Sequence, residues 1–393
     1  MEACGPWSVA HSLARSVLTQ DRQQAHVREP QQRGVVQTNT LPLLPYSPMY
    51  AAMNASDILT PTPGGLYCQA GDFFIDPVRA SPRALITHGH SDHARPGHGA
   101  VMATRETLGL MELRYGPDFS TTRQAAVYGE TVRMGDARVS FHPAGHVLGS
   151  AQILIEVDGC RVVVSGDYKR AHDPTCAPFE VLRCDAFISE ATFGLPVFRH
   201  PDPREEVAKL LDSCRAFPDR AHLVGAYSLG KAQRLMALIR EAGWERPIYI
   251  HGAMEKITDF YRAEGAALGE VIKVAARDRG KLGGEIIICP PSATRDLWAR
   301  AFADPVVAFA SGWMRIRARA RQGGVQLPLV VSDHADWDEL RATILETECE
   351  EVWITHGAED ALVHWAIQRG LRAQPLHLMG YGDEDDTEAK QSE

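Results

Sequence analysis

Short apolar runs, many of them alternating with polar positions, dominate residues 64–190 and are separated by Gly, Asp and Pro. Such runs predict strands joined by tight turns. Alternation on both sides of Asp158 and Gly159 predicts a β-hairpin with a two-residue turn, whereas TRETLGLMELRYG, residues 104–116, predicts a helix. We therefore expect this part of the chain to be rich in β-sheet.

After Pro201 the pattern changes to helices that alternate with strands. REEVAKLLDSCRAF and KAQRLMALIREAG have helical spacing, and AHLVGAY, PIYIHG and EIIICPP are short apolar runs. This alternation is typical of βα units with a parallel sheet. The strand-rich pattern returns with QLPLVVSDHADWDELRATI. The sequence thus predicts an α/β module inserted late into a strand-rich domain.

Both ends of the chain lack such periodicity. Residues 1–52 are rich in Gln, Pro, Ser and Arg, and the chain closes with DEDDTEAKQSE. These compositions predict a disordered N-terminal extension over 1–52 and an acidic disordered tail over 381–393. Met53 is a candidate alternative start, so it stays open whether residues 1–52 belong to the native protein.

Composition and charge narrow the class of protein. The 393 residues, 45% of them hydrophobic, suffice for two domains or for one domain with a large insertion. No apolar run approaches the roughly 18 residues that cross a bilayer, and the eight cysteines form no CxxC pair. We expect a cytoplasmic protein with reduced cysteines and no membrane partner. The net charge of −9 opposes a polyanionic partner, although part of this acidity lies in the tail.

The segment THGHSDH brings three histidines and an aspartate into one turn directly after an apolar run. Alternate residues at the end of a strand point the same way, and imidazole and carboxylate are ligands that zinc prefers. Histidine or aspartate also follows three later apolar runs, in FHPAGH, VVVSGD and VWITHG. The pattern predicts two metal ions about 3.5–4 Å apart. The predicted ligands are His88, His90 and His146 for one ion, Asp92, His93 and His356 for the other, and Asp167 as a bridge.

These motifs resemble a known family. HGHSDH followed by AGHVLGS, SGD and a late THG resembles the metallo-β-lactamase fold, in which these positions are di-zinc ligands. FISEATFG, VVSDHADWDEL and VWITHGAED resemble motifs A, B and C of the β-CASP nucleases. PTPGGLYCQAGDFFIDP, GAYSLGKAQR and ASGWM add a likeness to the bacterial ligase-associated DNA exonucleases, also named mRNA 3′-end processing factors. The resemblance covers about residues 55–375.

The resemblance implies an α/β fold, an αββα metallo-β-lactamase sandwich with an inserted α/β β-CASP domain. It also assigns supporting residues: Asp76 steadies the histidine loop, Glu190 is the motif A acid, and His334 is the motif B histidine. The predicted division is a disordered extension at 1–52, the first part of the sandwich at 53–195, the insert at 196–325, the last part of the sandwich at 326–380, and the tail at 381–393.

The implied activity is hydrolysis of phosphodiester bonds with two Zn²⁺ ions, for which Mn²⁺ can substitute in vitro. A hydroxide that bridges the metals would attack, and His334, oriented by Glu190, would protonate the leaving oxygen. Asp92 and Asp167 complete the predicted catalytic set, and the products would carry a 5′-phosphate and a 3′-hydroxyl. RNA enzymes of the group carry histidine at motif C, so His356 leaves it open whether the substrate is DNA or RNA.

We expect DNA end processing in repair, with functional association with an ATP-dependent DNA ligase and a helicase. RNA 3′-end processing is the alternative. A hydrolase of small esters, thioesters or lactams is a further hypothesis, because the di-zinc loop serves those substrates too, but a small substrate needs no inserted module. A non-catalytic binding subunit is a third hypothesis, which the complete set of ligands opposes.

Two further motifs bear on nucleic-acid binding. GAYSLGK fits a phosphate-binding P-loop except that Ala232 stands where Ser or Thr is needed, so nucleotide hydrolysis is not expected. The helix start near Lys231 is either a contact for a backbone phosphate or an ordinary capped helix. MRIRARAR, if extended, presents one basic face for phosphates, or else a solvated edge strand. The candidate nucleic-acid contacts are Lys231, Ser311, Arg315, Arg317 and Arg319.

Overall fold

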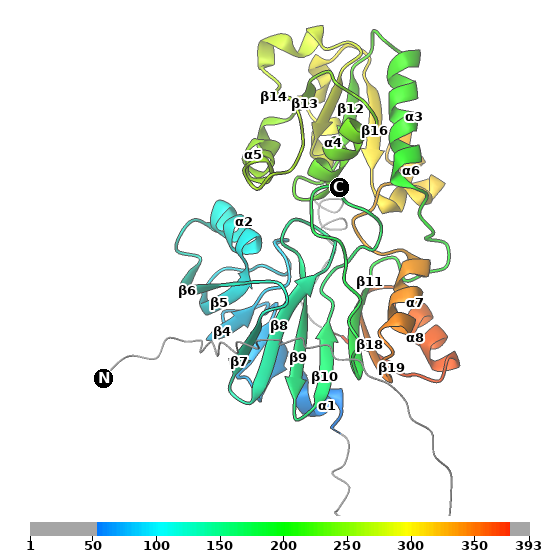
Figure 1. Ribbon diagram of the computed structural model, residues 1–393. Coiled ribbons are helices and arrows are strands. Elements are labelled where there is room, and N and C mark those ends of the chain that lie inside the picture. The colour runs from blue at the N-terminus through cyan, green and yellow to red at the C-terminus, as the bar shows by residue number, and fades with distance from the viewer. Residues whose placement is uncertain (1–52, 378–393) are drawn as a thin grey trace, which may run out of the picture.

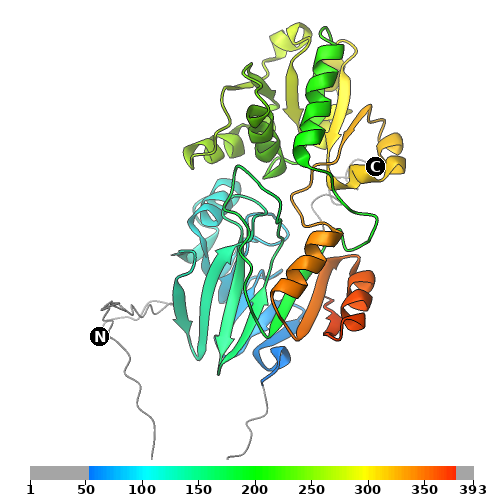
Figure 2. The same cartoon turned by 45° about the vertical axis from the view of Figure 1, so that its right-hand side comes forward.

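The strands form a two-layer sandwich and a separate third sheet. The computed structural model describes residues 53–377, so the predictions for 1–52 and 381–393 lie outside the described residues. Figure 1 shows the third sheet with its helices at one end of the sandwich, and Figure 2 shows the same arrangement from a second side. We call the third sheet with its helices, residues 203–329, the insert.

The first sheet of the sandwich has six strands in the order β1-β2-β3-β4-β5-β6. Helix α2 covers its outer face, where Met111 packs with Val101 and Phe119, and this helix lies where the sequence predicted one. The bounds are α1 Ala55–Ile58, β1 Leu59–Thr62, β2 Gly65–Cys68, β3 Phe73–Ile75, β4 Arg83–Leu85, β5 His98–Thr104, α2 Arg105–Tyr115 and β6 Ser120–Ala126.

The second sheet has the order β19-β18-β11-β10-β9-β8-β7. Strands β9 and β10 form the predicted hairpin, because Val157 pairs with Cys160 and the two turn residues Asp158 and Gly159 have φ angles of 48° and 87°. The bounds are β7 Thr131–Met134, β8 Ala137–Pro143, β9 Ala151–Val157, β10 Cys160–Val164, β11 Ala186–Ala191, α7 Trp337–Glu346, β18 Glu351–Gly357, α8 Glu359–Gln368 and β19 Arg372–Pro375.

Apolar side chains hold the layers together. Leu85 of the first sheet and Ile153 and Trp353 of the second belong to one core between the sheets. Leu340 of α7 and Leu362 of α8 belong to a second core against the outer face of the second sheet. Helix, sheet, sheet and helix thus follow one another, and the predicted αββα fold class is confirmed.

The insert is a parallel α/β unit, as the alternation of helices and strands predicted. Its sheet has the order β14-β13-β15-β12-β16-β17, and every pair within it is parallel. The bounds are α3 Pro203–Ala216, β12 His222–Gly225, α4 Lys231–Glu241, β13 Ile248–Ile250, η1 Gly252–Met254, α5 Glu255–Ala263, β14 Val271–Lys273, η2 Ala276–Lys281, β15 Ile286–Cys289, η3 Pro291–Thr294, η4 Ala299–Ala301, β16 Val306–Ala310, η5 Gly312–Arg315, α6 Arg317–Gln322 and β17 Leu327–Leu329.

Two sequence expectations for the insert differ from the structure. Strand β17 pairs with β16, although the predicted boundary placed residues from 326 onward in the sandwich, because a three-residue strand offers too little periodicity to assign. The arginine-rich segment is not extended: it forms η5 and α6. Arginine and alanine both favour helix, and here this preference outweighs the alternating pattern. The remaining domain boundaries stay a prediction.

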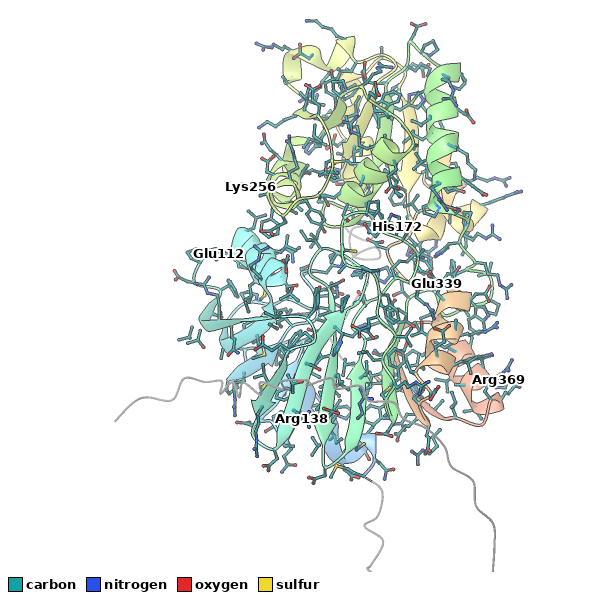
Figure 3. All side chains as sticks on the ribbon, viewed as in Figure 1. Glu112, Arg138, His172, Lys256, Glu339 and Arg369 are labelled. Carbon is teal, nitrogen blue, oxygen red and sulfur yellow. The ribbon has the colours of Figure 1, made fainter. Side chains whose placement is uncertain are left out.

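The insert and the sandwich meet near the ends of the central strands. Figure 3 shows His172 and Glu339 at this junction, whereas Arg138 and Arg369 lie toward the other end of the sandwich. None of the helices within residues 53–377 has the length and apolar content that a membrane span requires. The seven cysteines of this range are free thiols, and six of them are buried.

Candidate metal centre

The histidine loop follows strand β4 and is held by Asp76, which is 4% exposed. The Oδ1 atom of Asp76 accepts a hydrogen bond from the Thr87 amide at 2.8 Å, and Oδ2 accepts one from the Thr87 hydroxyl at 2.6 Å. The same Oδ2 lies 2.8 Å from Nδ1 of His93. Asp76 therefore contacts both ends of the loop.

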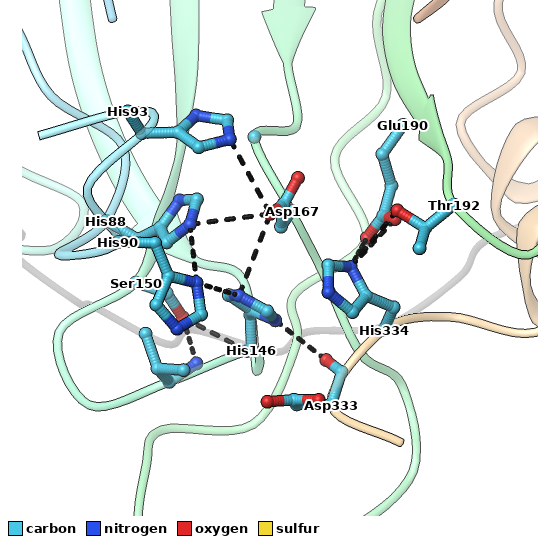
Figure 4. Close-up of polar contacts among 12 residues, drawn as sticks. His88, His90, His93, His146, Ser150, Asp167, Glu190, Thr192, Asp333 and His334 are labelled. Carbon is cyan, nitrogen blue, oxygen red and sulfur yellow. Dashed lines mark hydrogen bonds and ion pairs between the residues drawn. The ribbon is translucent and has the colours of Figure 1, made fainter. Parts of the chain in front are cut away.

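Three imidazoles converge on one point beside Asp167. The Nδ1 atom of His90 lies 3.1 Å from His88 Nε2 and 3.0 Å from His146 Nε2. Asp167 Oδ2 completes the group at 3.4 Å from His88 and 3.8 Å from His146 (Figure 4). We call His88, His90 and His146 the first-ion group. The side chains of these three histidines and of Asp167 are all buried.

A second group shares Asp167. The Oδ2 atom of Asp167 lies 3.6 Å from His93 Nε2, and the Oδ1 atom of Asp167 lies 3.6 Å from His356 Nδ1. The Nε2 atom of His93 is also 3.7 Å from Asp92 Oδ2. We call Asp92, His93 and His356 the second-ion group. The structure therefore brings all seven predicted ligands into one cluster, with Asp167 between the two groups.

The geometry of this cluster fits a metal site. Four donors at 2.0–2.1 Å from a tetrahedral zinc ion are separated from one another by about 3.3 Å. The spacings of 3.0–3.8 Å around His90 and Asp167 bracket this value. Imidazole nitrogens face one another here, an arrangement that a shared cation stabilises. The buried His and Asp side chains therefore form a site that can hold metal.

The ring nitrogens turned away from the cluster also have partners. His88 Nδ1 lies 3.1 Å from the Thr87 hydroxyl, His90 Nε2 lies 3.3 Å from the Leu229 carbonyl, and His146 Nδ1 lies 2.8 Å from the Asp333 carbonyl. Such outer partners fix the orientation of an imidazole and the nitrogen that carries its proton.

The two groups differ in charge before any metal binds. Burial, followed by the positive charges of His334 and His90, lowers the pKa of His146 to about 3. Burial and then the charge of His93 also lower the pKa of His88 well below its ordinary value. The second-ion group behaves in the opposite way. Burial would lower the pKa of His93, but the carboxylates of Asp167, Asp92 and Asp76 outweigh it and raise the pKa to about 10.

The shared carboxylate stays ionised for the same reason. Burial alone would raise the pKa of Asp167, but the imidazoles of His93, His356 and His88 hold that pKa well below its usual range. An ionised carboxylate is the form that binds a metal ion. Asp167 is therefore ready to act as a ligand at neutral pH.

A histidine–glutamate pair lies beside the cluster. His334 Nδ1 is 3.0 Å from Glu190 Oε2 and 3.2 Å from Oε1, and the Tyr168 amide donates to Oε1 at 2.7 Å. The ring of His334 lies 4.6 Å from that of His146, centroid to centroid. Glu190 comes from β11, and His334 from the segment between β17 and α7. The fold therefore joins distant parts of the chain at one site.

The predicted nucleic-acid contacts divide into two kinds. Lys231 is 1% exposed and its Nζ atom lies 3.0 Å from Asp333 Oδ1, and Ser311 is fully buried with its hydroxyl accepting from the Trp313 amide. These burials do not favour either residue as a contact for a nucleic-acid backbone. The arginines are exposed on η5 and α6, where the Arg319 guanidinium lies 3.9 Å above the Trp313 ring.

Sequence reasoning missed Leu229 and Asp333. Leu229 contributes a backbone carbonyl, which has no signature in the sequence. Asp333 precedes His334 directly, and this adjacency in SDHAD was the one available signal. Its partner Lys231 was assigned a different role because the two residues are far apart along the chain.

Comparisons with known proteins show several relatives of the chain. A probable DNA ligase of Opitutus terrae is 26% identical over 313 residues, which cover 79% of this chain and 30% of that protein. The endoribonuclease Ysh1 of Aspergillus fumigatus is 33% identical over 139 residues, 34% of this chain and 15% of that protein. An RNase J-like protein of Methanocaldococcus jannaschii is 25% identical over 236 residues, 53% of this chain and 56% of that protein.

The chain thus spans less than two thirds of each of these relatives. No family model matches it. A solved structure of a protein of unknown function from Enterococcus faecalis V583 superposes with a TM-score of 0.54 at 12% identity, over 77% of this chain and 80% of that one, and supports the fold alone. The chain is thus similar to relatives named probable DNA ligase, endoribonuclease Ysh1 and RNase J-like protein, and its buried His/Asp cluster could hold metal.

Proposed function

We propose that this chain is a zinc-dependent nuclease that hydrolyses phosphodiester bonds of DNA. The observation that carries the proposal is the carboxylate of Asp167, which lies between two groups of metal-binding side chains and beside the His334–Glu190 pair. Phosphodiester hydrolysis needs an activated water and a stabilised leaving oxygen. These side chains can provide for both.

The first-ion group and the second-ion group would each hold one zinc ion, with Asp167 shared. When bound, a zinc pair supplies a water molecule that loses its proton near neutral pH and positive charge beside the phosphate. The protein keeps the ligands ready through Asp76, which binds the loop, and through the low pKa of Asp167.

His334 would give the proton to the leaving oxygen. Because Glu190 binds Nδ1 of His334, that proton would come from Nε2. The Glu190 carboxylate orients the imidazole, and the Tyr168 amide fixes the carboxylate in turn. His334 is thus the proposed general acid, and Glu190 is the residue that positions it.

DNA and RNA are the two candidate substrates. The similarity to a protein named probable DNA ligase extends over 79% of the chain and favours DNA end processing. The alternative is an RNA 3′-end processing nuclease, favoured by the relatives named endoribonuclease Ysh1 and RNase J-like protein and by His356. The exposed arginines of η5 and α6 suit the phosphates of either polymer.

The likeness to a longer, ligase-named relative also supports functional association with an ATP-dependent DNA ligase. An associated helicase stays a prediction. A cytoplasmic location is part of this proposal, and the free thiols of the seven cysteines in residues 53–377 are compatible with it.

One experiment tests the function. Purified protein is incubated with end-labelled single- and double-stranded DNA and RNA, and the products are sized over time. We expect zinc-dependent shortening of DNA that leaves 5′-phosphates. Faster cleavage of RNA would establish the alternative. Cleavage of neither polymer, with turnover of a small ester or thioester instead, would contradict a nuclease.

A further inference from the structure

Two outer partners of the first-ion group come from outside the two sheets of the sandwich. The Leu229 carbonyl, 3.3 Å from His90 Nε2, belongs to the insert between β12 and α4. The Asp333 carbonyl, 2.8 Å from His146 Nδ1, belongs to residues 332–334, which we call the return segment because they lead from β17 back to α7. Figure 4 shows the contact between His146 and Asp333.

Helix α4 of the insert holds the return segment at two points. Lys231 Nζ forms an ion pair with Asp333 Oδ1 at 3.0 Å, and their side chains are 1% and 4% exposed. Arg234 donates a hydrogen bond to the Ser332 carbonyl and a second, at 3.3 Å, to the His172 carbonyl in the sandwich. Asp333 and His334 are neighbours in the chain. Lys231 and Arg234 therefore also hold the backbone next to His334, the proposed general acid.

The start of α4 packs against the loop that carries His146. Gly230 has a φ of 86°, and a Cβ atom there would lie only 2.3 Å from Cγ1 of Val147. The Leu148 amide donates to the Tyr261 hydroxyl of α5 at 3.2 Å. The two residues after His146 therefore contact the insert directly, Val147 through its side chain and Leu148 through its amide.

The second-ion group is supported from a different place. The outer nitrogen of His93 lies 2.8 Å from Asp76 Oδ2, and Asp76 follows β3 of the sandwich. The printed contacts of α4 near the cluster are to the return segment, whereas His93 contacts Asp76 of the sandwich. This arrangement makes the two halves of the cluster distinguishable by mutation.

We propose that Lys231 and Arg234 are positioning residues through which the insert sets the metal affinity of the first-ion group. The proposal rests on the proposed function, because it takes the cluster to hold two zinc ions. Removing the Lys231 ammonium leaves the Asp333 carboxylate buried without its cation, so the return segment shifts and its carbonyl no longer meets His146. Loss of such an outer partner lowers metal affinity by about 10–100-fold.

The test is a zinc titration of the metal-free full chain in competition with a chromophoric chelator. We expect Lys231→Met to weaken one of two zinc sites by about 10–100-fold and to leave the other within about threefold. Asp76→Asn should instead weaken both sites, because Asp76 contacts His93 and also the Thr87 hydroxyl that meets His88. Lys273→Met is the matched control, because it removes an exposed ion pair with Glu255 in the same domain, and both of its zinc affinities should equal those of the wild type.

A background variant identifies which site is affected. His88→Ala should bind one zinc ion, and adding Lys231→Met to it should change the remaining affinity by less than about threefold. Asp333→Asn keeps the side-chain volume and the backbone carbonyl, and it should weaken the same site as Lys231→Met by a smaller factor. It replaces Lys231→Met in the test if that variant does not fold. Cobalt absorption spectra of these variants should change for the weakened site alone.

The outcomes separate two failures. Two wild-type sites whose affinities are unchanged in Lys231→Met and Asp333→Asn would overturn the positioning role and leave the nuclease proposal standing. Equal weakening of both sites would also overturn it, since that result indicates general destabilisation. A wild-type chain that binds no zinc would instead overturn the metal assignment itself.

Discussion

The two halves of the His/Asp cluster contain similar side chains but differ in what surrounds them. The first-ion group consists of imidazoles whose outer nitrogens contact the Leu229 and Asp333 carbonyls and the Thr87 hydroxyl, and its histidines His88 and His146 have lowered pKa values. The second-ion group contains His93, whose outer nitrogen contacts Asp76 and whose pKa is raised. The two halves thus differ in charge and in part of their supports, although Asp76 contacts both His93 and the Thr87 hydroxyl.

The difference shows that histidines of one short motif can have outer partners from different parts of the fold. The donors follow strand ends in the sandwich, whereas part of the scaffold that orients them comes from the insert. Because the insert contacts the cluster directly, a change in the insert can alter how the ligand side chains are oriented. The following predictions test how separate the two halves are.

The largest expected effect comes from the carboxylate that the halves share. Asp167→Asn removes the charge that lies between the two groups, so we expect both zinc ions to be lost and cleavage to fall by about 10³-fold or more. Elemental analysis and a cleavage assay measure this. Asp259→Asn, at an exposed position of α5, is the control. A variant that kept one ion tightly would show that Asp167 is not shared.

The next largest effect is expected from His334, which belongs to neither the first-ion group nor the second-ion group. His334→Ala should keep both zinc ions and bind substrate nearly as well, while the cleavage step slows by about 10²–10⁴-fold, because the leaving oxygen loses its proton donor. Single-turnover kinetics and metal analysis measure this. Glu190→Gln should give a milder form of the same defect, and His364→Ala, at an exposed position of α8, should behave as the wild type.

A substrate with a better leaving group sharpens this prediction. A nitrophenolate ester needs little protonation as it leaves, so the defect of His334→Ala should shrink on it. An equal defect on both substrates with zinc retained would contradict the general-acid role and indicate that His334 positions the phosphate. Loss of metal would make it a ligand.

The pH dependence of zinc binding should separate the two halves. His93 has a pKa of about 10 in the metal-free protein and must release its proton to bind zinc. The affinity of the second-ion group should therefore fall about tenfold for each unit by which the pH drops below 10. The lowered pKa values of His88 and His146 predict a shallower dependence for the first-ion group between about pH 6 and 9. Chelator-competition titrations at several pH values measure both slopes, and equal slopes would contradict the contrast.

The smallest effect on chemistry should come from the arginines of η5 and α6. Changing Arg315, Arg317 and Arg319 together to Gln should weaken nucleic-acid binding and reduce its dependence on salt, since each phosphate contact adds about 0.7–0.9 to the slope. The single-turnover cleavage rate at saturation should change little. Filter binding at several salt concentrations measures the slope.

A matched control uses three exposed arginines elsewhere in the insert. Arg204, Arg215 and Arg262 are 76%, 71% and 45% exposed and form short-range ion pairs. Their change to Gln removes the same total charge, so a general effect of charge would appear in both triple variants. If the two slopes agree, the arginines of α6 are ordinary solvated surface.

The sequence predicted the sandwich and the residues that gather in the His/Asp cluster because both have strong local signals. Alternating apolar runs predict strands, and THGHSDH places ligand side chains directly after one of them. The insert was recognisable for the same reason. A residue such as His356 could be assigned because it also follows an apolar run.

The rest depended on contacts that local sequence does not encode. GAYSLGK indicates either a phosphate contact or an ordinary capped helix at Lys231, and no local pattern indicates its partner Asp333 in another segment or the Leu229 carbonyl. The arginine-rich segment has both an alternating pattern and a strong helix preference, and its helical state in the folded insert could not be derived from the pattern alone.

Zinc content and cleavage, measured on one preparation, test the central claim most directly. Undenatured protein should contain about two zinc ions per chain and shorten end-labelled DNA. Chelation should abolish both, and added zinc should restore both in parallel. One ion or none in active protein, or cleavage that persists after chelation, would contradict a two-zinc nuclease.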